Sequence, residues 1–128
     1  MKIEHFALQV EDPIAVAQWY GEHLGLVVKR TTGAPTHTHF LADDSGQAMV
    51  EFYNNSKVTT PDYPAMDPLL LHLAFVSEDP ERDRDRLLAA GATLAEDLVT
   101  TPAGDRLVML RDPWGLAIQL VKRAAPML

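Results

Sequence analysis

The sequence predicts an α+β fold made of two β-α-β-β-β modules related by a pseudo-twofold axis. The first observation is an internal repeat, because IEHFALQVEDP at residues 3–13 returns as LLHLAFVSEDP at residues 70–80. The second is that a helix and three strand-like runs follow both copies in the same order. A module of about sixty residues buries little apolar surface alone, so the two modules are expected to pair their sheets. Five residues recur 67 positions apart: His5 and His72, Ala7 and Ala74, Glu11 and Glu78, Asp12 and Asp79, Pro13 and Pro80.

Each module opens with a strand, because apolar side chains alternate there with the period of two that is typical of a half-buried strand. An Asp-Pro pair follows at residues 12–13 and again at 79–80. The aspartate is a favourable N-cap, and the proline suits the first helical position, where a missing N–H costs nothing. Glycine is common just past the last helical turn, so Gly25 and Gly91 are expected to end the helices. The helices are therefore expected at residues 14–24 and 81–90.

Three strand-like runs follow each helix, separated by turns rich in Gly, Pro and Asp. The segment between the modules holds three of the nine prolines and is expected to be a linker. The predicted organisation is one domain over residues 1–128, with module one at 1–55, the linker at 56–68 and module two at 69–128. The predicted strands are 26–32, 37–43 and 47–53 in module one, and 93–100, 106–112 and 116–122 in module two.

Composition limits the classes of function. The 128 residues are 47% hydrophobic and 23% charged, as in an ordinary globular domain. A net charge of −7 would repel phosphates, so no nucleic-acid partner is expected. No apolar run is as long as a membrane span, which needs about 18 residues, so no membrane partner is expected. The acid and the histidine within MKIEHFALQVED argue against a signal peptide. Because there is no cysteine, a metal would need nitrogen or oxygen ligands, and a cytoplasmic location is expected.

Each module carries two potential metal ligands on the strand face opposite its helix. His5 and His72 lie on the opening strands, and Glu51 and Gln119 lie 68 positions apart on the closing strands. If both modules curl alike, the four side chains converge. Two imidazoles, a carboxylate and an amide oxygen suit a divalent ion such as Zn²⁺, Ni²⁺, Co²⁺, Mn²⁺ or Fe²⁺. The alternative is that both histidines are hydrogen-bonded core residues, although an inward-facing carboxylate is costly unless it is paired or bound to a metal.

The whole chain resembles the vicinal oxygen chelate superfamily, which includes glyoxalase I, bleomycin-resistance proteins and extradiol dioxygenases. The resemblance rests on IEHFALQVED with WYGEHLGL, on LLHLAF with LLAAGA, and on RDPWGLAIQLV, which is similar to the superfamily's D-P-x-G-x-x-I-E-L pattern. It implies a cupped mixed sheet with helices on its outer face, a small-molecule substrate and a homodimer. The superfamily's four ligand positions fall on His5, Glu51, His72 and Gln119.

The resemblance implies a metal-dependent lyase or isomerase of glyoxalase type. In that chemistry the metal chelates two adjacent oxygens of the substrate, and an enediolate is stabilised as a neighbouring carbon loses its proton. Glu51 is the residue expected to act as general base as well as ligand. Gln119 departs from glyoxalase I, where this position is most often glutamate, and an amide cannot act as a base.

Two other functions remain open at this point. The first is a non-catalytic drug-binding protein resembling the bleomycin-resistance proteins, for which the negative charge suits a cationic drug. The second is an extradiol-type dioxygenase, whose iron site resembles this one except that it has a carboxylate where Gln119 stands. His37 and His39 in THTHF are expected to share a strand face, but they have no counterpart in module two and are not assigned a role.

Overall fold

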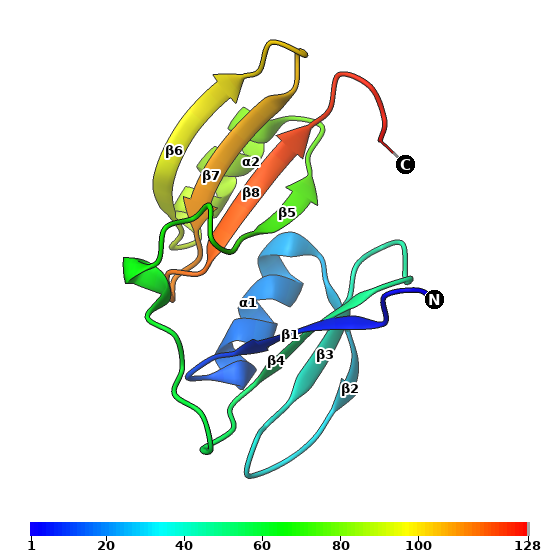
Figure 1. Cartoon of the computed structure of the whole chain (residues 1–128), viewed down its shortest axis with the longest axis vertical. Coiled ribbons are helices and arrows are strands. Elements are labelled where there is room, and N and C mark those ends of the chain that lie inside the picture. Colours follow the sequence, from blue (N-terminus) through cyan, green and yellow to red (C-terminus); the bar gives the residue numbers. More distant parts are fainter. Residues whose placement is uncertain (128) are drawn as a thin grey trace. The chain divides into compact units, whose positions relative to one another are not determined.

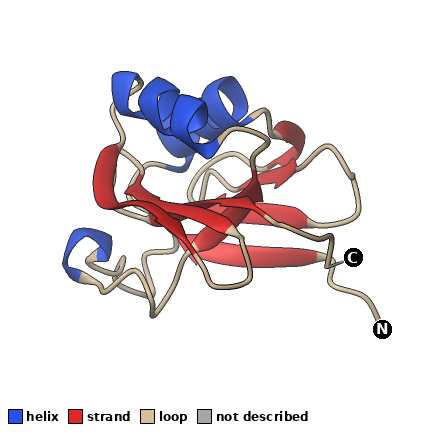
Figure 2. Cartoon of the chain, turned by 90° about the horizontal axis from the view of Figure 1, so that it is seen from above, coloured by secondary structure: helices blue, strands red, loops and turns tan. Residues whose placement is uncertain are grey.

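The computed structural model describes residues 1–127, which divide into two compact units, Met1–Pro61 and a second unit that begins at Asp62. Each unit has the order β-α-β-β-β and a four-stranded mixed sheet (Figures 1 and 2). The predicted α+β fold of two such modules is therefore confirmed. The division between the units falls inside the predicted linker, at 56–68.

The sheet of the first unit has the strand order β1-β4-β3-β2. The opening strand β1 runs parallel to the closing strand β4, and the other neighbours are antiparallel. The first helix, α1, therefore connects β1 and β2, which are the two edge strands of this sheet. The elements are β1 (His5–Gln9), α1 (Pro13–Leu24), β2 (Val27–Thr31), β3 (His39–Ala42) and β4 (Met49–Tyr53).

The sheet of the second unit repeats this topology as β5-β8-β7-β6, again with the opening and closing strands parallel. A short 3₁₀ helix, η1, lies in the segment before β5 and was not predicted. The elements are η1 (Tyr63–Ala65), β5 (Leu73–Val76), α2 (Pro80–Ala89), β6 (Thr93–Thr100), β7 (Arg106–Arg111) and β8 (Ala117–Lys122).

The helix ends follow the predicted capping chemistry. Asp12 Oδ1 accepts a hydrogen bond from the backbone N–H of Ala15 at 3.0 Å, and Asp79 Oδ1 accepts one from Arg82 at 3.1 Å. Gly25 follows α1 at a φ of 75°, in the left-handed region that favours glycine. The repeated Asp-Pro sequence thus starts both helices in the same way.

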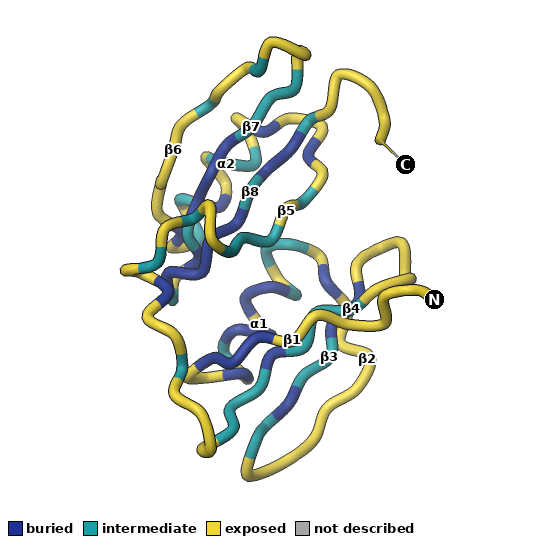
Figure 3. Tube along the Cα trace, viewed as in Figure 1, coloured by how far each residue is buried: buried dark blue, intermediate teal, exposed yellow. Residues whose placement is uncertain are grey.

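Each helix covers one face of its own sheet. In the first unit α1 packs against β3 and β4, and the fully buried rings of Tyr20 and Phe52 lie 4.8 Å apart. In the second unit α2 packs against β7 and β8, where Leu110 and Ile118 are fully buried with Leu87 of the helix. Figure 3 shows this burial along β7 and β8 and the exposure of β2 and β6. Among the residues described, no helix is long and apolar enough to cross a membrane.

Candidate metal-binding residues

The first unit brings two of the predicted ligands together. Glu51 of β4 pairs in register with Ala7 of β1, and His5 lies two residues earlier on the same face of β1. The His5 Nε2 atom lies 3.3 Å from Glu51 Oε2. Glu51 is the more enclosed of the two, because its side chain is 17% exposed and that of His5 is 37% exposed. The pair therefore lies on the sheet face opposite α1, with the carboxylate set deeper.

The other ring nitrogen of His5 is occupied. Its Nδ1 atom contacts the carboxylate of Glu4, which is an acceptor, so Nδ1 carries the proton and Nε2 faces Glu51. This hydrogen bond to Glu4 raises the pKa of His5, and the charges of Glu4 and Glu51 act in the same direction, while desolvation opposes them. The ring of Phe40 meets the imidazole edge-on at 5.5 Å. Two neighbours thus fix the orientation of His5.

The second unit repeats the arrangement at the level of strand register. Gln119 of β8 pairs with Ala74 of β5, as Glu51 pairs with Ala7. His72 lies two residues before Ala74, immediately before β5 begins. His72 and Gln119 therefore occupy the positions in the second sheet that His5 and Glu51 occupy in the first. Both His72 and Gln119 are half-buried.

His72 is held by the backbone. Its Nδ1 atom donates to the carbonyl oxygen of Pro68 at 2.8 Å, because a carbonyl can only accept. In the neutral ring this leaves the lone pair on Nε2. Histidines that bind metals usually donate their other ring N–H to a carbonyl or a carboxylate, which fixes the tautomer. His5 and His72 both follow this pattern.

The four predicted ligands occur as two pairs, one in each unit. Within residues 1–127 no group of three or more His, Cys, Asp or Glu side chains lies close enough to hold a metal ion. The remaining histidines of THTHF do not add a site. His39 begins β3, and its Nδ1 contacts the carbonyl of His37 at 2.7 Å. His37 precedes the strand with a φ of 45°, so the expectation that the two share a strand face is wrong.

The model of the Glyoxalase/Bleomycin resistance protein/Dioxygenase superfamily matches residues 2–120 of the chain. The chain belongs to this superfamily. The match includes both units and all four predicted ligand positions. A search of curated proteins finds no match.

Solved structures with the superfamily fold agree with this assignment. The chain is similar to SMU.1112c at 27% identity and a TM-score of 0.73, over 95% of this chain and 98% of that one. It is similar to TnmS3, an antibiotic binding protein from Streptomyces sp. CB03234, at 20% identity and a TM-score of 0.75, over 97% of both chains. It is also similar to a mutant of glyoxalase I from Zea mays at 21% identity and a TM-score of 0.75, over 97% of this chain and 46% of that one. Because the identities to TnmS3 and to the glyoxalase I mutant are only 20% and 21%, these two similarities show a shared fold and nothing more.

The donor atoms at the four predicted ligand positions are of types that suit a divalent metal ion. Two ligand atoms at about 2.0–2.1 Å from one tetrahedral ion lie roughly 3.3–3.4 Å apart, which is the separation of His5 Nε2 and Glu51 Oε2. A neutral imidazole and a carboxylate oxygen are suitable donors for borderline divalent ions. The Nδ1 hydrogen bonds of His5 and His72 leave Nε2 of each ring for coordination.

Three residues around the pairs were not predicted from the sequence. Glu4 and Phe40 flank His5, and the carbonyl of Pro68 holds His72. Glu4 could have been found from its position next to the histidine. Phe40 depends on the β3–β4 register, in which it pairs with Glu51, and Pro68 depends on the path of the linker. These two contacts have no local signal in the sequence.

Proposed function

We propose that the protein is a metal-dependent lyase or isomerase of glyoxalase type acting on a small molecule with two vicinal oxygens. The observation that carries the proposal is the His5–Glu51 pair, at 3.3 Å, together with the repeat of its strand register at His72 and Gln119. In this proposal the four side chains hold one divalent ion, which requires the two modules of a single domain, or of two chains in a homodimer, to face each other.

When bound, the divalent ion would supply Lewis-acid stabilisation of the negative charge that develops on the substrate oxygens. The side chains of the protein divide the remaining tasks. The Nδ1 hydrogen bonds of His5 and His72 hold their imidazole rings in one orientation. Gln119 provides a neutral amide oxygen. Glu51 takes the proton from the carbon next to the substrate carbonyl, because it is the only carboxylate among the four. Its partial burial keeps the base away from bulk water.

The first test is metal content by inductively coupled plasma mass spectrometry on untagged protein purified without chelators. The proposal predicts near-stoichiometric metal that is lost in the His5→Ala, His72→Ala double variant. A His37→Ala variant is the matched control, because it removes an imidazole outside the two pairs and should retain the metal. No metal after reloading with Zn²⁺, Ni²⁺, Co²⁺, Mn²⁺ and Fe²⁺ would contradict the proposal.

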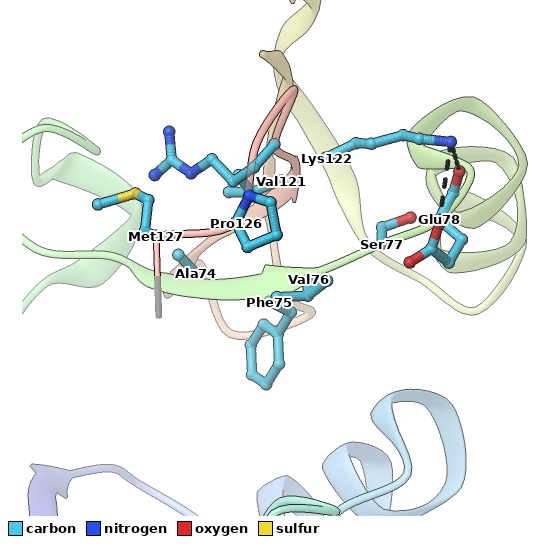
Figure 4. Close-up of a pocket in the computed structure, with 10 residues that line it drawn as sticks. Ala74, Phe75, Val76, Ser77, Glu78, Val121, Lys122, Pro126 and Met127 are labelled. Carbon is cyan, nitrogen blue, oxygen red and sulfur yellow. Dashed lines mark hydrogen bonds and ion pairs between the residues drawn. The ribbon is translucent and has the colours of Figure 1, made fainter.

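A second candidate is a non-catalytic small-molecule binder, which a groove of about 560 Å³ in the second unit favours. Figure 4 shows apolar side chains of β5 and of the C-terminal segment around this groove. At its edge the Lys122 ammonium donates to the carbonyl of Glu78 at 2.6 Å. The binder would take up a drug-sized apolar ligand without metal, so the metal analysis separates the two candidates. The apolar lining comprises Ala74, Phe75, Val76, Val121, Pro126 and Met127.

A further inference from the structure

Arg111, at the end of β7, binds three backbone carbonyl oxygens. Its Nη1 donates to Tyr63 and to Gly115, both at 2.9 Å, and its Nη2 donates to Met66 at 2.7 Å. The side chain is half-buried, and within residues 1–127 no ion pair joins it to a carboxylate. Hydrogen bonds from a charged donor are about twice as strong as neutral ones, so this guanidinium fixes the backbone it contacts.

Two of the three carbonyls belong to the segment that leads to His72. Met66 is followed by a tight turn in which Asp67 accepts hydrogen bonds from Leu69 N at 2.9 Å and from Leu70 N at 3.0 Å. The carbonyl of Pro68, inside this turn, accepts the Nδ1 hydrogen bond of His72 at 2.8 Å. Hydrogen bonds and a single turn thus connect the guanidinium to the imidazole.

The sheet brings the two ends of this connection to the same edge. Arg111 pairs in register with Ala117, the first residue of β8. His72 lies one residue before Leu73, which pairs with Ile118. Arg111, the turn and His72 are therefore all at the end of the sheet where β8 begins, two residues before Gln119.

We propose that Arg111 is a positioning residue for His72: it fixes the turn at Asp67–Leu70, and this turn holds the imidazole as the Nδ1–H tautomer with Nε2 available to a metal ion. The metal-binding consequence rests on the proposed function, whereas the tautomer does not. A lysine cannot replace the arginine fully, because an ammonium lacks the planar fork that reaches three carbonyls together. Gly115 contributes a carbonyl to the same arrangement.

The tautomer of His72 is the direct test. Long-range ¹H–¹⁵N correlation spectra of metal-free, ¹⁵N-labelled protein distinguish Nδ1–H from Nε2–H rings, and a His72→Gln variant assigns the signal. Measured at a pH where the imidazoles are neutral, wild-type His72 should be mainly the Nδ1–H tautomer. Arg111→Met should shift the ring toward Nε2–H, and Arg111→Lys should shift it less. Arg82→Met, an exposed arginine on α2, is the matched control and should leave the tautomer unchanged.

Asp67→Ala provides a second variant in case the arginine substitutions unfold the protein. It removes the exposed carboxylate that accepts from Leu69 N and leaves the sheet intact, so it should shift the tautomer in the same direction. A wild-type His72 that is mainly Nε2–H would overturn the proposal. So would a folded Arg111→Met protein with the wild-type tautomer.

Zn²⁺ affinity, measured by competition with a chromogenic chelator, is the second readout. Loss of a residue that orients a metal-binding histidine typically weakens binding by about 10–100-fold, and this loss is expected for Arg111→Met but not for Arg82→Met. If the wild-type protein binds no metal, the proposed function fails while the tautomer measurement still decides the role of Arg111. If it binds Zn²⁺ and Arg111→Met binds it equally well, the positioning role fails and the proposed function stands.

Discussion

The two units share one topology and one strand register, yet they hold their histidines by different means. In the first unit His5 is oriented by the side chain of its neighbour, Glu4, and faces a carboxylate, Glu51. In the second unit His72 is oriented by a backbone carbonyl, and the residue corresponding to Glu51 is the amide Gln119. The repeat therefore preserves where the histidines lie and changes what surrounds them.

The two units therefore differ in the chemical groups that surround their histidines. Of the four predicted ligands, Glu51 in the first unit is the one that is a carboxylate, whereas the second unit has the amide Gln119 at the corresponding position. In the second unit the Arg111 guanidinium donates to the carbonyl oxygens of Tyr63 and Met66, in the segment that leads to His72. The position of Arg111 is taken in the first unit by Ala42, which pairs with Met49 as Arg111 pairs with Ala117. Ala42 has no polar side chain to supply such contacts.

The largest effect is expected for Glu51→Gln, which makes the first unit resemble the second at this position. The amide keeps an oxygen for coordination but cannot accept a proton, so turnover should fall by about 10²–10⁴-fold. Metal affinity should be partly retained. Exchange of the C–H proton for solvent deuterium in a panel of α-hydroxycarbonyl compounds, followed by NMR, measures the base directly.

The control for this substitution is Gln119→Glu, which leaves Glu51 in place and should retain exchange. The double variant, with glutamine at 51 and glutamate at 119, moves the carboxylate to the other unit. It should bind metal as the wild type does, and exchange that returns in it would show that a carboxylate at position 119 can replace Glu51 as the base. Exchange at the wild-type rate in Glu51→Gln alone would eliminate Glu51 as the base.

A pair of glycines tests the rigidity of the second unit. Gly115 has a φ of 91°, and a Cβ added there would lie 2.4 Å from Pro64 Cγ, whereas Gly25 has a φ of 75° and no atom within 4 Å of an added Cβ. Gly25→Ala should lower the free energy of unfolding by about 1–2 kcal/mol, because alanine must adopt the left-handed conformation there. Gly115→Ala should lower the free energy of unfolding by the same amount and by about 1–3 kcal/mol more, because the added Cβ overlaps Pro64. Urea denaturation of both variants measures the difference, and equal losses would show that η1 moves away freely.

The N-caps provide a comparison in which the units should behave alike. Asp12→Ala and Asp79→Ala each remove one hydrogen bond from the first turn of a helix, and each should destabilise its own unit by about 1 kcal/mol. Trp19 reports on the first unit and Trp114 on the second, so single-tryptophan variants (the other tryptophan replaced by Phe) followed by fluorescence separate the two losses. A cap substitution that unfolds both units together would show that they are not independent.

The elements that the sequence predicts well are those with local signals. The Asp-Pro starts, the glycine after α1 and the alternation of apolar residues are all properties of short segments, and β6 at Thr93–Thr100 has its predicted bounds. The repeat shows which positions of the two units are equivalent, but the strand order within each sheet was not predicted. The short helix η1 was missed, although it has a local signal: Asp62 caps it by accepting a hydrogen bond from Ala65 N, and Pro64 lies in its first turn.

The four candidate ligands could be identified from the sequence, but the residues that hold them in place could not. Both histidines are visible in the sequence as a repeated residue, and Glu51 is visible as a carboxylate in an apolar strand. Arg111 was not identified, because its partners are backbone carbonyls as far as 48 positions away and leave no pattern in the sequence. Backbone acceptors are supplied by every residue, so no residue type indicates their use.

The smallest expected effect concerns the response of the two units to acid. The hydrogen bond from Ala124 N, at 2.9 Å, and the Arg123 guanidinium, at 2.8 Å, lower the pKa of Asp105 below its ordinary value of 3.8. Because the folded pKa is the lower one, this contribution to stability is present above the ordinary value and is lost as the pH falls toward the folded pKa. In the first unit Asn54 Nδ2 donates instead to the carbonyl oxygens of Val10 and Glu11, and this neutral amide does not titrate.

Asp105→Asn should therefore reduce the acid sensitivity of the second unit, followed by Trp114 fluorescence, and leave that of the first unit unchanged. Denaturant midpoints measured from pH 5 downward test this, with Asp44→Asn as a control at an exposed aspartate of the first unit. The effect is small because Arg123 and Asp105 lie near the surface, where water and salt screen their attraction. An unchanged pH profile of the second unit in Asp105→Asn would mean that its acid sensitivity arises at other carboxylates, with Asp97 beside Arg84 as the next to test.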